Sequence, residues 1–162
     1  VARRGELYLR VDREVGNTDL PLDPGGLALA PGVADALESL RSRGVRIGII
    51  SDTGFAPGAT LRRYLSHHGL LDAFDHWSFS DEVGVYKPHP EIFRHALDGL
   101  GVAAPATAAH VGDLRRTDAG GANAAGMTSV RYAGVWEDPD DHLPDADHVI
   151  AHHDELVPLL LG

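Results

Sequence analysis

The feature that most constrains the fold is a regular alternation between helical periodicity and short apolar runs. Apolar residues recur at helical spacing in residues 31–43, 57–68, 90–100, 119–125 and 156–161. Between these segments, short apolar runs predict strands at residues 45–50, 76–80, 108–111, 128–132 and 148–150. Strands that alternate with helices favour a parallel sheet with helices on both faces. The sequence therefore predicts an α/β, Rossmann-like fold, and no linker divides residues 1–162 into more than one domain.

The charge and composition exclude several classes of function. The chain carries 24 acidic and 14 basic residues, a net charge of −10, so we expect no nucleic-acid partner, which would need a basic face. No apolar run approaches the roughly 20 residues of a membrane span, and no signal segment opens the chain. We therefore expect a cytoplasmic protein with no membrane partner. The absence of cysteine excludes thiolate metal sites and a cysteine nucleophile.

Polar residues stand where predicted strands end. Ser51 and Asp52 follow the strand at 45–50, and Asp113 follows the strand at 108–111. Lys87, the single lysine of the chain, follows the predicted strand at 76–80 after the loop 81–86. In an open α/β sheet, ligands bind outside the carboxyl ends of the strands. We therefore expect these side chains to converge on one edge of the sheet.

The convergent groups suit a phosphate and a hard cation. The Ser51 hydroxyl can donate to a phosphate oxygen, and the Lys87 ammonium can neutralise phosphate charge. Asp113 and Asp118, five residues apart before a helix, can hold Mg²⁺ through oxygen.

Three segments in this order resemble the haloacid dehalogenase (HAD) phosphohydrolase superfamily, over roughly residues 31–135. Ile49–Gly54 is similar to its second motif, a strand that ends in Ser or Thr. Val85–Phe93 is similar to its lysine motif, and His110–Asp118 to its GDxxxxD motif. The resemblance implies a HAD-like fold with a minimal or absent cap. A partner subunit or the substrate itself would then close the site, which allows a homodimer.

The resemblance also implies roles for these residues. Ser51 would bind the transferring phosphoryl group, with Asp52 beside it in the substrate site. Lys87 would balance the charge between phosphate and nucleophile. Asp113 would ligate Mg²⁺, and Asp118 would support the metal site.

The nucleophile of the first family motif has no clear counterpart in this chain. The nearest match is residues 7–14, LYLRVDRE, which offers Asp12 as nucleophile and metal ligand and Glu14 for proton transfer. Arg10 interrupts the apolar run that a central parallel strand should have. Leu7, Val11 and Val15 also recur at helical spacing. On that second interpretation the motif lies upstream of Val1 or has been lost.

Two functions follow from these interpretations. The first is a Mg²⁺-dependent phosphohydrolase that acts on a small phosphorylated metabolite through an aspartyl-phosphate intermediate. The second is a catalytically disabled or truncated HAD-fold protein that serves as a binding module. A phospho-receiver domain fits less well, because Lys87 precedes Asp113 here and follows the other residues in receivers. A true dehalogenase would not need the Mg²⁺ site.

The remaining charged residues are expected to lie in solvent. We expect Arg115 and Arg116 to be exposed and the acidic run 137–141 to form a solvated loop. Among the ten histidines, only His89 is expected near the site.

Overall fold

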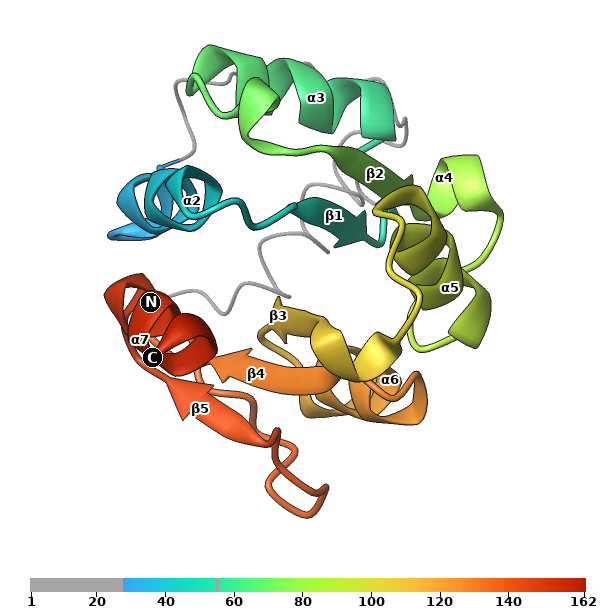
Figure 1. Cartoon of the computed structure of the whole chain (residues 1–162). Helices are drawn as coiled ribbons and strands as arrows, with labels where there is room; N and C mark the ends of the chain where they lie inside the picture. Colours follow the sequence, from blue (N-terminus) through green and yellow to red (C-terminus); the bar gives the residue numbers. More distant parts are fainter. Residues whose placement is uncertain (1–27, 55) are drawn as a thin grey trace.

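The computed structural model describes residues 28–54 and 56–162, and all structural statements below concern those residues. They form the predicted strands and helices (Figure 1). In addition, Ser80–Val83 form a short helix where a loop was expected at 81–86. The strands are β1 (Gly48–Ser51), β2 (His76–Phe79), β3 (Ala109–Gly112), β4 (Thr128–Tyr132) and β5 (His148–Ile150). The helices are α2 (Val33–Ser42), α3 (Gly58–His67), α4 (Ser80–Val83), α5 (Pro90–Gly99), α6 (Gly120–Ala124) and α7 (Leu156–Leu161).

Within the described residues the strands are all parallel and form two sheets, which confirms the predicted α/β class. One sheet has the order β1-β2 and the other the order β3-β4-β5. Within the described residues, β1 and β3 each pair on one side only. One edge of each sheet therefore carries backbone groups with no strand partner in this part of the chain.

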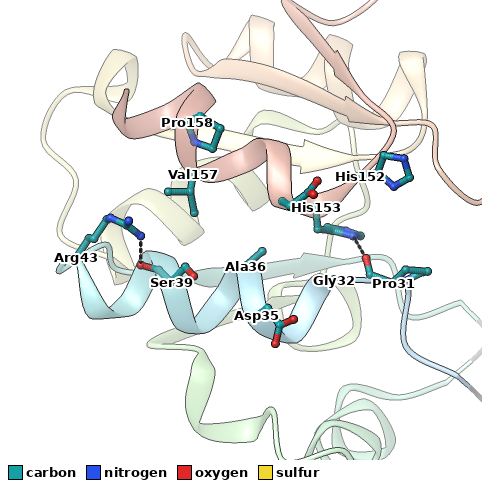
Figure 2. Close-up of a pocket in the computed structure, with 11 residues that line it drawn as sticks. Pro31, Gly32, Asp35, Ala36, Ser39, Arg43, His152, His153, Val157 and Pro158 are labelled. Atoms are coloured by element: carbon teal, nitrogen blue, oxygen red, sulfur yellow. Dashed lines mark hydrogen bonds between the residues drawn. The ribbon is translucent and has the colours of Figure 1, made fainter.

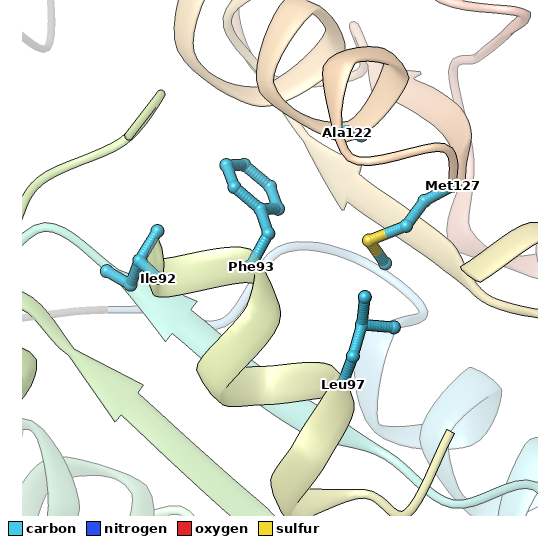
Figure 3. Packing of buried hydrophobic residues seen from close by; sticks show 5 residues of the cluster. All are labelled: Ile92, Phe93, Leu97, Ala122 and Met127. Atoms are coloured by element: carbon cyan, nitrogen blue, oxygen red, sulfur yellow. The ribbon is translucent and has the colours of Figure 1, made fainter. Parts of the chain in front are cut away.

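Helix α5 joins the two sheets into one core. Ile92, Phe93 and Leu97 of this helix are buried together with Ala122 and Met127 (Figure 3). Their spacing places the apolar side chains on one face of the helix. Ile50 of β1 and Ala108, just before β3, pack against the same cluster. The burial of α5 thus holds the ends of β1 and β3 on a common support.

A second cluster packs α2 and α7 against β4 and β5. Ala36 of α2, Val130 of β4, Ile150 of β5 and Leu156 of α7 are buried against one another. This packing brings the first and last described helices together, as Figure 1 shows. No helix in the described part of the chain is long and apolar enough to cross a membrane.

Element boundaries differ from the predicted ones by a few residues, for identifiable reasons. The strand expected at 45–50 begins at Gly48, because its partner β2 begins at His76, opposite Gly48. Ile47 contacts the loop before β2 instead: its N–H donates to Asp75 Oδ2 at 2.8 Å. The helix expected from 119 is preceded by a π-helical turn, η4 (Arg115–Ala119).

Candidate active site

The predicted hydroxyl and carboxylate stand at the carboxyl end of β1, and the start of α4 anchors the loop that follows. Ser51 is the last residue of β1 and is half-buried, as is Asp52. The N–H of Thr53 donates to Ser80 Oγ at 2.8 Å, and Thr53 Oγ1 donates to Asp81 Oδ1 at 2.9 Å. Because Ser80 and Asp81 begin α4, directly after β2, the loops at the carboxyl ends of both strands form one hydrogen-bonded unit.

Lys87 connects this unit to the second sheet. Its backbone N–H donates to Asp52 Oδ1 at 2.9 Å, and its Nζ lies 2.5 Å from Asp118 Oδ1. The Lys87 side chain is 12% exposed, so this ion pair is largely shielded from solvent. The Lys87–Pro88 peptide bond is cis. One residue thus brings the loop after β1 and the turn after β3 together.

Asp118 is buried with both of its carboxylate oxygens engaged. Oδ1 contacts Lys87 and also His110 Nε2 at 2.9 Å, and Oδ2 accepts the Leu114 N–H at 3.1 Å. Burial by itself raises the pKa of this carboxyl. The hydrogen bond from His110 and the charge of Lys87 outweigh that effect, so the pKa of Asp118 lies well below its usual value. Asp118 is therefore a buried anion that holds Lys87 in place.

Asp113 follows the last residue of β3 and is half-buried. Gly112 before it has no Cβ, and a Cβ there would overlap the Asp118 side chain. The close approach of strand and carboxylate therefore requires glycine at this position.

The donor set for a metal ion is incomplete within the described residues. A hard cation such as Mg²⁺ takes carboxylate oxygens, and Asp113 offers a group of that chemistry. However, residues 28–54 and 56–162 contain no group of three His, Asp or Glu side chains that could hold a metal ion. Asp12, the third predicted ligand, lies outside the described residues, as does Glu14. The described donors fit Mg²⁺ in kind, and at least one further ligand is needed.

His110 is a site residue that the sequence analysis missed. It is 9% exposed, touches Asp118, and lies edge-on to the Phe93 ring at 5.3 Å between centroids. Its position on β3, two residues before Gly112, was the available signal. His89, the one histidine expected near the site, is the N-cap of α5: its Nδ1 accepts the Glu91 N–H at 3.3 Å.

The expectation that Arg115 is exposed was wrong. Arg115 is 9% exposed and forms ion pairs with Glu137 and Asp145, both at 3.1 Å. The acidic segment expected in solvent is therefore partly buried: the Arg115 guanidinium binds it, and Asp138 within it is 3% exposed. Arg116 is exposed, as expected.

A hollow of about 520 Å³ lies elsewhere, between α2 and the C-terminal turn and helix (Figure 2). Pro31, Asp35, Arg43, His152 and His153 are among the residues that line it. His153 Nδ1 lies 3.0 Å from the Pro31 carbonyl oxygen. Of the predicted site residues that the structure describes, none lines this hollow, so it is separate from the cluster around Lys87.

Comparison with known proteins agrees with the arrangement of these segments. Residues 13–126 match the family model of haloacid dehalogenase-like hydrolases. This range includes Ser51, Asp52, Lys87, Asp113 and Asp118, and it begins one residue after Asp12.

Two curated relatives have 36% identity to this chain. One is haloacid dehalogenase-like hydrolase domain-containing protein 3 of Mus musculus, similar over 132 residues, 80% of this chain and 50% of that protein. The other is glyceraldehyde 3-phosphate phosphatase of Methanopyrus kandleri, similar over 122 residues, 71% of this chain and 50% of that protein. The chain thus spans about half the length of these relatives.

A solved structure shares the fold. The HAD phosphatase from Thermococcus onnurineus superposes with a TM-score of 0.75 at 34% identity, over 86% of this chain and 61% of that one. The family match, the relatives and the strand-end cluster around Lys87 lead to one conclusion: this chain belongs to the haloacid dehalogenase-like hydrolases.

Proposed function

We propose that this chain, as one HAD-like domain, is a Mg²⁺-dependent phosphohydrolase for a small phosphorylated metabolite. The observation that carries the proposal is the double attachment of Lys87, to Asp52 after β1 and to Asp118 after β3. The Lys87 ammonium, shielded beside Asp118, supports a role in neutralising the charge of a phosphate bound at Ser51. A small phosphate ester as substrate is supported by the phosphatases named among the relatives.

In the proposed reaction, a carboxylate oxygen of Asp12 attacks phosphorus. The bond from phosphorus to the ester oxygen breaks, and the leaving alcohol takes a proton, for which Glu14 is the candidate donor. Water then hydrolyses the aspartyl-phosphate, which releases inorganic phosphate and restores the Asp12 carboxylate. The Ser51 hydroxyl donates to a phosphoryl oxygen, with Asp52 beside it in the substrate site.

Asp113 and Asp12 would hold Mg²⁺, which supplies positive charge to the phosphoryl oxygens when bound. Asp118 supports the site through Lys87. The unpaired edges of β1 and β3 among the described residues are compatible with a further strand ending near this site. A cytoplasmic location and a homodimer that closes the site belong to the same proposal.

The test is hydrolysis of p-nitrophenyl phosphate by this chain, with Mg²⁺ or with EDTA. Asp12→Asn and Asp113→Asn are the active-site variants, and Asp141→Asn, on the exposed acidic segment, is the charge-matched control. We expect Mg²⁺-dependent turnover that both active-site variants lose and the control keeps. Turnover that survives Asp12→Asn would refute Asp12 as nucleophile. No turnover by folded wild-type protein would refute the phosphatase and favour the binding module.

A further inference from the structure

The loop between β4 and β5 holds the turn that follows β3. Asp138 on this loop is 3% exposed, and its Oδ2 accepts a hydrogen bond from the Arg115 backbone N–H at 2.6 Å. The Asp138 carbonyl oxygen also accepts a hydrogen bond from the Arg115 guanidinium. Arg115 is the first residue of the π-helical turn η4, and Leu114 before it provides no side-chain cap. Asp138 therefore satisfies an N–H at the start of the turn that has no partner within it.

The same turn is held from its inner side by Asp118. The N–H of Leu114 donates to Asp118 Oδ2 at 3.1 Å. Two consecutive backbone N–H groups, those of Leu114 and Arg115, are thus bound by carboxylates from different segments of the chain. Asp113 directly precedes Leu114 and directly follows Gly112, which is paired with Arg131 in the sheet. The backbone on both sides of Asp113 is therefore fixed by hydrogen bonds.

Ion pairs hold the loop that carries Asp138. Arg131 of β4 is buried, and its Nε donates to Asp145 Oδ1 at 2.6 Å. Glu137 lies 2.9 Å from Arg131 and 3.1 Å from Arg115. The hydrogen bonds from Arg131 lower the pKa of Asp145 well below its usual value, and a guanidinium stays charged at all ordinary pH values. Ion pairs thus hold the loop in place, and Asp138 connects the held loop to the turn after β3.

We propose that Asp138 is a positioning residue for the reaction. By binding the Arg115 N–H, it sets the path of the turn from Asp113 to Asp118, and thereby the place of the Asp113 carboxylate relative to Lys87. Asp138 touches neither Lys87 nor Asp118 in the hydrogen bonds of the described residues, so its effect is exerted through Arg115. The consequence for turnover rests on the proposed function, whereas the consequence for the turn does not.

Three variants separate this role from simple support of the loop. Asp138→Ala removes the acceptor for Arg115. Asp138→Asn keeps one oxygen for the Arg115 N–H and gives up the second contact, from the Asp140 N–H at 3.0 Å. Asp147→Ala is the control, because Asp147 holds the same loop through the Ser129 N–H at 2.8 Å. Its side-chain hydrogen bonds within the described residues go to Ser129 and not to Arg115.

The first measurement is amide hydrogen exchange of peptides covering residues 113–119 in protein without added metal. We expect exchange there to be about tenfold faster in Asp138→Ala, since a capping acceptor contributes on the order of one factor of ten in an equilibrium. Asp138→Asn and Asp147→Ala should stay close to wild type in this segment. Equal exchange in Asp138→Ala and Asp147→Ala would overturn the proposal.

The second measurement is p-nitrophenyl phosphate hydrolysis with Mg²⁺. Asp138→Ala should lower kcat by about tenfold or more with KM within roughly twofold, because a small misplacement of a catalytic group costs rate. Asp138→Asn should recover most of kcat. A KM effect alone, or no recovery by Asn, would overturn the positioning role. If wild-type protein has no turnover, the phosphatase proposal fails, and the exchange measurement still decides the role of Asp138 in the turn.

Discussion

Gly112→Ala tests whether the geometry around Asp118 holds the site together. An ideal Cβ at Gly112 would overlap the Asp118 side chain, with Cγ at 2.2 Å, Cβ at 2.4 Å and Oδ1 at 2.5 Å. Ordinary contacts of a Cβ begin near 3.4 Å, so the carboxylate must retreat by about 1 Å. The far end of Asp118 is not free to do so, because it is buried among Lys87, His110 and the Leu114 N–H.

The expected cost follows from these contacts. Overpacking of a well-packed site costs about 1–3 kcal/mol, and a weakened hydrogen bond to a charged group costs about 1.5–3 kcal/mol. Since the two effects overlap, we expect a loss of about 3 kcal/mol in the free energy of unfolding. For a chain of this size, that lowers Tm by about 6–12 °C.

Urea denaturation and a thermal melt followed by circular dichroism would measure this loss. Gly54→Ala is the matched control. Gly54 lies in the neighbouring loop after β1, and a Cβ there meets no atom of the described residues within 4 Å. The control should change the free energy of unfolding by less than about 1 kcal/mol. If Gly112→Ala melted within about 2 °C of wild type, the close packing of β3 on Asp118 would not be a source of stability, and the reasoning would fail.

Three further predictions concern other parts of the same core. The ionised form of Asp118 should stabilise the fold fully above its unfolded pKa of about 3.9 and progressively less as pH falls toward its lowered folded pKa. In urea denaturation, the difference in stability between wild type and Asp118→Asn should therefore shrink from pH 7 to pH 3. A difference that does not depend on pH would contradict this. Lys87→Arg keeps the charge, but the shielded position beside Asp118 and His110 suits a compact ammonium rather than a planar guanidinium. We expect it to lower kcat for p-nitrophenyl phosphate by about tenfold or more, and wild-type turnover would show that charge alone suffices. Phe93→Ala should cost about 3–5 kcal/mol in urea denaturation because Phe93 is fully buried, whereas Leu114→Ala, at a residue 37% exposed, should cost less than about 1 kcal/mol; similar costs for the two would refute the assignment of the core.

Much of the architecture follows from local sequence pattern. The helical and apolar periodicities predicted the α/β class, and the strand ends placed Ser51, Asp52 and Asp113 correctly at the ends of β1 and β3. The presence of a single lysine singled out Lys87, which the structure joins to Asp118. The family resemblance is confirmed by the match over residues 13–126. The roles of these residues, and of Asp12 above all, stay predictions.

Local pattern is enough to predict the order of the elements and the chemical groups at strand ends, because periodicity and breaker residues act over a few neighbouring positions. Only the tertiary structure decided which of those groups touch. From sequence, His110 is one more strand residue, and only the packing of β3 shows its contact with Asp118. Arg115 is predicted to be exposed, and only the fold brings Asp138, 23 residues away, into contact with it. Which residues contact each other depends on how distant segments of the chain meet in three dimensions. A charged side chain buried there needs a partner, because an unpaired buried charge costs much free energy.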